Sequence, residues 1–158
     1  MGWPSRTAGL PRAAPRRRER TRMSTRSSGP PRDRPKMRRV LVVDDSATIR
    51  TIVKATIEVH APKGTVSIDE AASAEEALSQ LSAGPVDLML VDWNMPRTDG
   101  LSLVKQLRSR GSEMPIIMVS AVSDAPHIQE AKRAGVTDYV TKPFQMAELW
   151  SRIRAHLD

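Results

Sequence analysis

The chain of 158 residues contains no cysteine, which excludes disulfide bonds and metal sites built from thiolates. It also lacks any apolar run near the roughly 18 residues that would cross a bilayer. The longest such run, around Ile116 to Val122, is only as long as a strand and contains Ser120. The N-terminus has no apolar core of the kind that a secretory signal needs. We therefore expect a cytoplasmic protein with no transmembrane segment.

Acidic residues are scarce at the start of the chain. Residues 1–39 contain 13 Lys or Arg and two acids, a net charge of +11, whereas residues 40–158 contain 12 Lys or Arg and 16 acids, a net charge of −4. The excess of positive charge belongs to the first segment, which argues against a generally basic, nucleic-acid-binding domain. Residues 1–36 are rich in Arg, Pro, Ser and Gly and have little to bury, so we expect a disordered tail.

Two interpretations of this tail are open. It could be an electrostatic arm for nucleic acid, anionic lipid or an acidic partner, because clustered arginines attract polyanions. Trp3 is its only aromatic residue, so nothing supports base stacking. It could also be an extension without function, with Met23 or Met37 as the true start. Nucleic-acid binding is not expected from any other part of the chain.

From residue 38 onward, short β-branched runs alternate with segments of helical spacing. We expect five strands, at 38–43, 65–68, 86–91, 115–119 and 136–140. We expect five helices, after residue 46 and before Pro62, and at 74–81, 99–111, 124–134 and 145–157. This alternation predicts an α/β protein with a parallel sheet covered on both faces, and right-handed crossovers make it a doubly wound sandwich.

Three carboxylates stand at the ends of expected strands. Asp92 ends the buried run 86–91, and Asp44 and Asp45 follow the first strand. The carboxyl ends of parallel strands share one edge of a sheet, so these side chains would converge if their strands are neighbours. Such a cluster repels itself unless a proton or a cation compensates it, and oxygen ligands alone favour Mg²⁺. On the residues alone, Asp92 could bind a cation or act as a nucleophile.

Two further polar residues stand at the same expected edge. Ser120 ends the fourth strand and Lys142 follows the fifth. A hydroxyl and an ammonium group beside a carboxylate–metal site suit a phosphoryl group. Each residue also has an ordinary explanation: a helix cap for the aspartates, a core hydroxyl for Ser120 and a solvated charge for Lys142. The combination of compatible groups at the ends of four strands favours a functional site.

Four motifs, in this order, carry a resemblance to a known family. They are Val42-Val43-Asp44-Asp45-Ser46, Asp92-Trp93-Asn94-Met95-Pro96 with Asp99-Gly100, Ser120-Ala121, and Tyr139-Val140-Thr141-Lys142-Pro143-Phe144. Over about residues 38–157 the chain closely resembles the receiver domain of two-component response regulators, in particular the CheY-like ones. The resemblance implies a receiver domain at 37–158 with a flavodoxin-like (βα)5 fold and strand order 2-1-3-4-5.

The resemblance also implies roles for the carboxylates. Asp92 would be the phospho-acceptor and would take its phosphoryl group from a histidine kinase. Mg²⁺ would be held by Asp44, Asp45 and Asp92 together with the backbone carbonyl of Asn94.

Lys142, Ser120 and Tyr139 have roles implied in the same way. Lys142 would pair with the phosphoryl oxygens, Ser120 would move in to hydrogen-bond them, and Tyr139 would turn inward behind Ser120. This would couple the chemistry to the face formed by the expected helix 124–134, strand 136–140 and helix 145–157, where a downstream protein would bind. Taken alone, Tyr139 could equally be an aromatic residue at the rim of an exposed strand.

The chain departs from the chemotaxis pattern in two places. Ser120 replaces the commoner threonine, and Val122 stands where the chemotaxis protein carries an acid. An apolar Val122 cannot orient an attacking water, so the phosphoryl lifetime stays open. The three histidines, at 60, 127 and 156, lie off the motifs and are given no role.

We expect a stand-alone receiver that signals by phosphorylation-dependent protein binding, as in chemotaxis. Because the chain ends with the helix 145–157, a DNA-binding output domain is not expected. The protein would be a monomer or weak dimer and no enzyme, except that it assists its own phosphorylation and dephosphorylation. One alternative is a phosphorelay intermediate that passes the phosphoryl group from Asp92 to a histidine phosphotransfer protein. Another is a receiver-gated nucleic-acid or membrane binder that acts through the basic tail.

Overall fold

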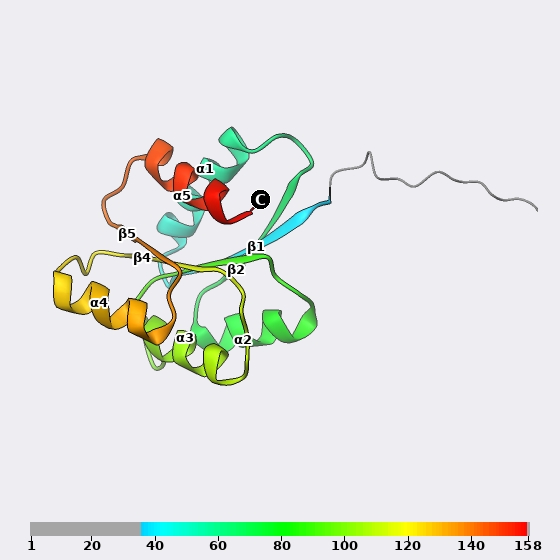
Figure 1. Ribbon diagram of the computed structural model, residues 1–158. Helices are drawn as coiled ribbons and strands as arrows, with labels where there is room; N and C mark the ends of the chain where they lie inside the picture. The colour runs from blue at the N-terminus through cyan, green and yellow to red at the C-terminus, as the bar shows by residue number, and fades with distance from the viewer. Residues whose placement is uncertain (1–35, 158) are drawn as a thin grey trace, which may run out of the picture. The chain divides into compact units, whose positions relative to one another are not determined.

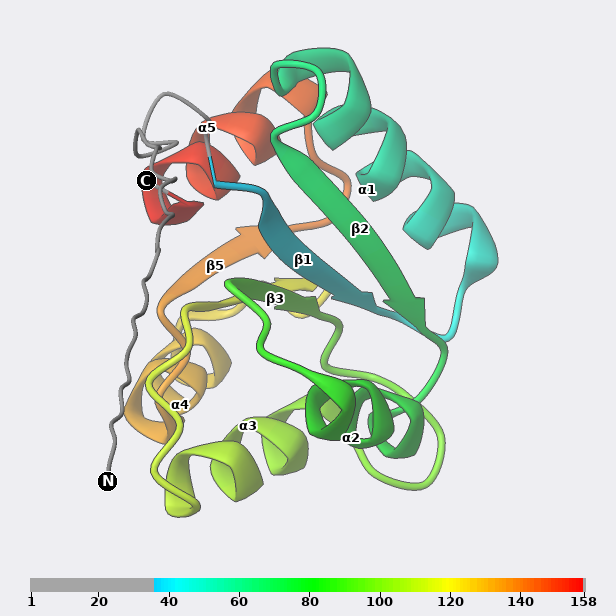
Figure 2. The same cartoon turned by 90° about the vertical axis from the view of Figure 1, so that its right-hand side faces the viewer.

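The computed structural model describes residues 36–157, which form a parallel five-stranded sheet covered by helices on both faces (Figures 1 and 2). The strands are β1 (Arg38–Val43), β2 (Val66–Ala71), β3 (Leu88–Val91), β4 (Ile116–Ser120) and β5 (Asp138–Thr141). The helices are α1 (Ala47–His60), α2 (Ala74–Ala83), α3 (Gly100–Ser109), α4 (Ala125–Ala134) and α5 (Met146–Leu157). The strand order β2-β1-β3-β4-β5 confirms the predicted fold class. The predicted disordered tail lies, Lys36 apart, outside the described residues.

The sheet is buried on both faces, as continuous apolar strands require. All four residues of β3 and all five of β4 are buried. Helices α1 and α5 cover one face, and α2, α3 and α4 cover the other (Figures 1 and 2). Successive residues of a strand point to opposite faces, so Leu41 packs in the core on the α2–α4 side and Val42 in the core on the α1–α5 side.

Every strand except β1 differs in extent from the sequence prediction; β3 begins at Leu88 rather than residue 86, and β4 lies one residue later than expected. β2 continues to Ala71 instead of ending at Ile68, and its last residue pairs with Val43 of β1. β2 lies at the edge of the sheet, where charged side chains are tolerated. Its Asp69 and Glu70 interrupt the apolar pattern from which the strand was predicted. β5 begins at Asp138 rather than residue 136, because residues 136 and 137 form the connection from α4.

Side-chain caps begin the helices that follow the first three strands. Ser46 Oγ accepts a hydrogen bond from Ile49 N (3.3 Å), and Asp99 Oδ1 accepts one from Ser102 N (2.8 Å). Ser73 caps α2 in the same way. Such caps satisfy backbone donors that have no partner within the helix, and in this way they stabilise the first turn of each helix. Among residues 36–157, no helix is both long and apolar enough to cross a membrane.

Candidate functional site

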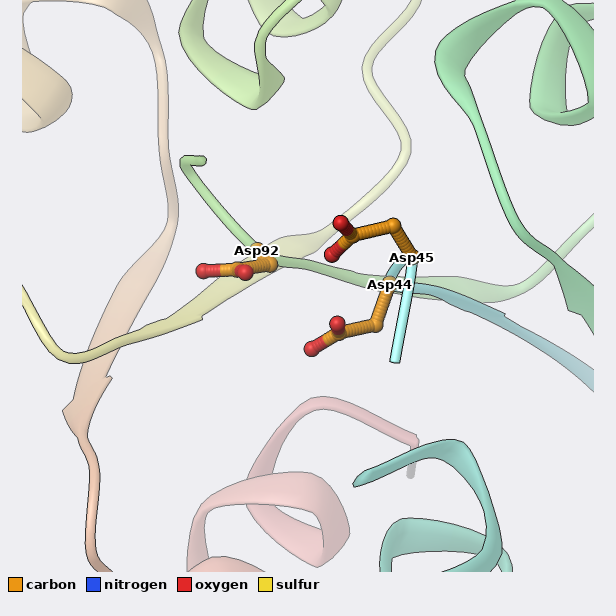
Figure 3. Close-up of side chains that lie close together, drawn as sticks. All are labelled: Asp44, Asp45 and Asp92. Carbon is orange, nitrogen blue, oxygen red and sulfur yellow. The ribbon is translucent and has the colours of Figure 1, made fainter. Parts of the chain in front are cut away.

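Three carboxylates converge at the carboxyl edge of the sheet. Asp44 and Asp45 follow β1, and Asp92 follows β3, which is hydrogen-bonded to β1 in the sheet. One oxygen from each lies within 4.8 Å of the others (Figure 3). Asp44 and Asp92 are buried, at 3% and 8% exposure, whereas Asp45 is open to solvent. This is the convergence that the strand-end argument predicted.

Backbone hydrogen bonds join the residue after each strand to the neighbouring strand. Asp44 N donates to Ala71 O on β2 (3.1 Å), and Asp92 N donates to Val43 O on β1 (3.0 Å). The Asp44 carboxylate turns back to accept a hydrogen bond from Ser46 N (2.9 Å). The two buried carboxylates are therefore carried on rigid strand ends rather than on a free loop.

Lys142, which follows β5, supplies a cation to this cluster. Its Nζ lies 2.8 Å from Asp44 Oδ2 and 3.4 Å from Asp92 Oδ2, and its side chain is largely buried. One ammonium thus faces three carboxylates, so the ionised cluster keeps a net negative charge. Lys142 holds the two buried carboxylates side by side without neutralising the group.

Burial raises the pKa of Asp92 above its ordinary value of 3.8, and the neighbouring Asp44 adds to the rise. Lys142 acts in the opposite direction but does not outweigh burial. A bound divalent cation would offset the repulsion between these carboxylates. The donors are carboxylate oxygens, with no sulfur or imidazole in the cluster, and Mg²⁺ favours such ligands. The residues present therefore fit the predicted magnesium.

Ser120 and Tyr139 meet at the loop between β4 and α4. Ser120 is fully buried at the end of β4, and its Oγ accepts a hydrogen bond from Val122 N (3.2 Å). The Tyr139 hydroxyl donates to the backbone oxygen of Val122. Tyr139 is only 7% exposed, which differs from the rim position considered from the sequence, and burial raises the pKa of its hydroxyl. Both predicted switch residues are thus bonded to the backbone of Val122.

Asn94 lies in the loop between β3 and α3, two residues after Asp92, and it is exposed. The implied role of its backbone carbonyl in metal binding stays a prediction.

Gly100, the first residue of α3, packs directly against Asp92. A Cβ at Gly100 would lie 2.0 Å from the backbone oxygen of Asp92, and Gly100 N donates to Trp93 O (2.7 Å). Any side chain would therefore push on the backbone that carries the Asp92 carboxylate. In the sequence, Asp99-Gly100 belongs to one of the motifs that carry the family resemblance and stands at the start of an expected helix.

His127 was given no role from the sequence, yet it contacts the residue after Asp92. The rings of Trp93 and His127 meet edge to face with centroids 5.3 Å apart. His127 Nδ1 lies 2.6 Å from Asp124 Oδ2 at the start of α4, and this hydrogen bond raises the pKa of His127. The loop that carries Asp92 is thus in contact with the first turn of α4. No sequence pattern indicated this contact.

Comparison with known proteins gives one consistent result. Residues 40–154 match the family of the response regulator receiver domain. The chain is 40% identical over 109 residues to the chemotaxis protein CheY1 of Helicobacter pylori, covering 67% of this chain and 86% of that protein. It is 38% identical over 115 residues to the cyclic di-GMP phosphodiesterase response regulator RpfG of Xanthomonas campestris pv. campestris, covering 72% of this chain but only 30% of RpfG. The receiver domain of the Francisella response regulator 1452 superposes with a TM-score of 0.70 at 32% identity, covering 76% and 96% of the two chains.

Proposed function

The chain belongs to the receiver domain family of two-component response regulators, and from this we propose that Asp92 accepts a phosphoryl group from a phosphohistidine of a histidine kinase. The observation that carries the proposal is the meeting of Asp44, Asp45, Asp92 and Lys142 at one edge of the sheet. Asp92 ends a buried strand, so its carboxylate is held in place for attack.

In the proposed reaction an oxygen of the Asp92 carboxylate attacks the phosphorus of the phosphohistidine. The new P–O bond forms as the P–N bond breaks, and the electrons of that bond stay with the imidazole nitrogen. Asp44, Asp45 and Asp92, with the backbone carbonyl of Asn94, would hold Mg²⁺. When bound, this ion supplies positive charge against the phosphoryl oxygens.

Lys142 would contribute the second positive charge. Its ammonium already lies between the carboxylates of Asp44 and Asp92, so a short movement brings it to a phosphoryl oxygen on Asp92. The domain would in this way assist its own phosphorylation and hydrolysis, and we propose no reaction on other substrates.

The proposed switch passes through the backbone of Val122. A phosphoryl oxygen on Asp92 would attract the Ser120 hydroxyl, which now accepts a hydrogen bond from Val122 N. Movement of this loop would also disturb the bond from Tyr139 to Val122 O, and with it the face formed by α4, β5 and α5. We propose that a downstream protein binds this face in a phosphorylation-dependent manner. The likeness to CheY1 supports a chemotaxis-like output.

The test of this function is phosphorylation by a small donor. Incubation of the full chain with acetyl phosphate and Mg²⁺ should add one phosphoryl group, seen by intact-protein mass spectrometry. Asp92→Asn should abolish the addition. Asp45→Asn, which keeps the acceptor but removes an exposed carboxylate from the cluster, should slow it. An unmodified wild type would overturn the proposal.

The relay alternative has its own outcome in the same assay. The phosphorylated chain is mixed with a histidine phosphotransfer protein, and the phosphoryl group is followed. Rapid transfer from Asp92 to histidine would favour a relay intermediate over a chemotaxis-like output. Retention on Asp92 would favour protein binding as the output.

A further inference from the structure

Arg50, in the first turns of α1, bridges the site and the edge strand. Its Nη1 donates to the backbone oxygen of Asp44 (2.6 Å), and its Nε donates to Glu70 Oε1 on β2 (3.0 Å). The Arg50 side chain is 16% exposed, so the guanidinium is largely withdrawn from water. A withdrawn guanidinium bonded at two places is a fixed support rather than a solvated charge.

The atom that Arg50 contacts belongs to the peptide group joining Asp44 to Asp45. The Asp44 side chain has supports of its own, from Ser46 N (2.9 Å) and Lys142 Nζ (2.8 Å). Within residues 36–157, by contrast, no side chain or backbone group donates a hydrogen bond to the Asp45 carboxylate. The direction in which Asp45 leaves β1 therefore depends on the orientation of this peptide group.

We propose that Arg50, held by Glu70, is a positioning residue that orients the Asp44–Asp45 peptide so that Asp45 faces Asp44 and Asp92 as a third ligand for Mg²⁺. Figure 3 shows the Asp45 side chain directed toward Asp92 in this arrangement. The proposal deepens the magnesium site of the proposed function and rests on it. Supports of this kind, one shell outside the ligands, tune metal sites because they fix ligand orientation.

A charge effect and a positioning role of Arg50 predict opposite changes in Mg²⁺ affinity when Arg50 is removed. A cation beside an acidic cluster repels Mg²⁺, so removal of its charge alone would tighten Mg²⁺ binding. If Arg50 instead orients Asp45, its removal leaves one ligand misdirected and weakens binding. The sign of the change in affinity therefore separates a positioning role from a simple charge effect.

Lys54 offers a matched control on the same helix. It lies one turn after Arg50, and its Nζ is 3.7 Å from Glu70 Oε2. It is 42% exposed, and it contacts the same carboxylate without a bond to Asp44. Lys54→Gln thus removes a neighbouring cation and a Glu70 partner while the Asp44–Asp45 peptide keeps its support.

The experiment is a calorimetric titration of the full chain with MgCl₂ at neutral pH. Arg50→Gln should weaken Mg²⁺ binding about tenfold, as the loss of an outer-shell support typically does. Glu70→Gln should weaken it less, and the double variant should lose little beyond Arg50→Gln because the two residues act through one contact. Lys54→Gln should bind as the wild type does or slightly more tightly.

Equal or tighter Mg²⁺ binding by Arg50→Gln would overturn the proposal, and so would an equal loss with Lys54→Gln. Urea unfolding without Mg²⁺ shows whether Arg50→Gln is folded. If it is not, Glu70→Gln decides, because it releases the other end of Arg50, and wild-type affinity in that variant refutes the positioning role. A wild type that binds no Mg²⁺ would instead refute the metal site of the proposed function.

Discussion

Replacement of Asp92 by asparagine should stabilise the fold when no Mg²⁺ is present. Asp92 is 8% exposed, and one of its oxygens lies within 4.8 Å of oxygens of Asp44 and Asp45. Asparagine keeps the shape of the side chain and removes its charge. The variant loses the proposed phospho-acceptor but should gain free energy of unfolding, because it removes a charge whose burial in the folded state is unfavourable.

The magnitude of this gain follows from four contributions. At an effective dielectric constant of about 20, charges at most 4.8 Å apart repel by at least about 3.5 kcal/mol, which applies to the buried Asp44. Repulsion from the exposed Asp45 is screened to about 1 kcal/mol or less. The attraction of Lys142 at 3.4 Å is about 5 kcal/mol and offsets these repulsions to within about 1 kcal/mol. What remains is the cost of burying the Asp92 charge, so we expect a gain of about 1 to 2 kcal/mol.

The effect should depend on pH in a defined direction. Burial raises the pKa of Asp92 above 3.8. Between pH 3.8 and the raised pKa, the folded state therefore holds a proton that the unfolded state has lost. The wild type therefore loses stability as the pH rises from 3.8 through the raised pKa. The advantage of Asp92→Asn should be complete at neutral pH and absent below pH 3.8.

The assay is urea unfolding of both full chains, in chelator and again with saturating MgCl₂. Mg²⁺ at about 100 times its dissociation constant should stabilise the wild type by about 2.7 kcal/mol and the variant by less. As a control, Asp69→Asn removes a carboxylate that is paired with Arg39 at 2.6 Å, and the free energy of unfolding of this variant should fall by up to about 1 kcal/mol. An Asp92→Asn variant that is less stable than the wild type at neutral pH without Mg²⁺ would show that burial of the Asp92 charge does not destabilise the fold.

Three more predictions concern Gly100, the pair of Asp124 and His127, and the basic tail. Gly100→Ala should cost about 1 to 3 kcal/mol in urea unfolding and slow phosphorylation by acetyl phosphate, because its Cβ would meet Asp92 O; wild-type behaviour would contradict this contact. Asp124→Asn should lower the pKa of His127 toward 6.5 in an NMR titration of the ring, and an unchanged pKa would count against their hydrogen bond. The interaction between protonated His127 and Asp124 adds stability below pH 6.5, and this contribution is lost as the pH rises through the raised pKa of His127. If the basic tail binds polyanions, the full chain should bind DNA or anionic vesicles more tightly at low salt than residues 37–158 do; equal binding would dismiss this role.

The sequence was sufficient for the architecture and for the carboxylate cluster. Strands buried on both faces are continuous apolar runs, so polar residues at their ends are conspicuous. In a parallel sheet the carboxyl ends of the strands lie at one edge, so Asp44 and Asp92 were expected to lie close together. The order of the strands came from the family resemblance rather than from periodicity.

Contacts between distant side chains could not be predicted in this way. The end of β2 was placed too early because Asp69 and Glu70 break the apolar pattern, and their partners Arg39 and Arg50 are remote in sequence. No periodic pattern in the sequence indicates the hydrogen bond from Arg50 to the backbone oxygen of Asp44. Such contacts depend on the spacing of packed elements.

The most direct test of the account is chemical mapping of the phosphorylated residue. The full chain is treated with acetyl phosphate and Mg²⁺, the acyl phosphate is trapped by borohydride reduction, and the peptides are sequenced by mass spectrometry. The account predicts a single reduced aspartate, at Asp92. Modification at Asp44 or Asp45 instead, or at no aspartate, would contradict it.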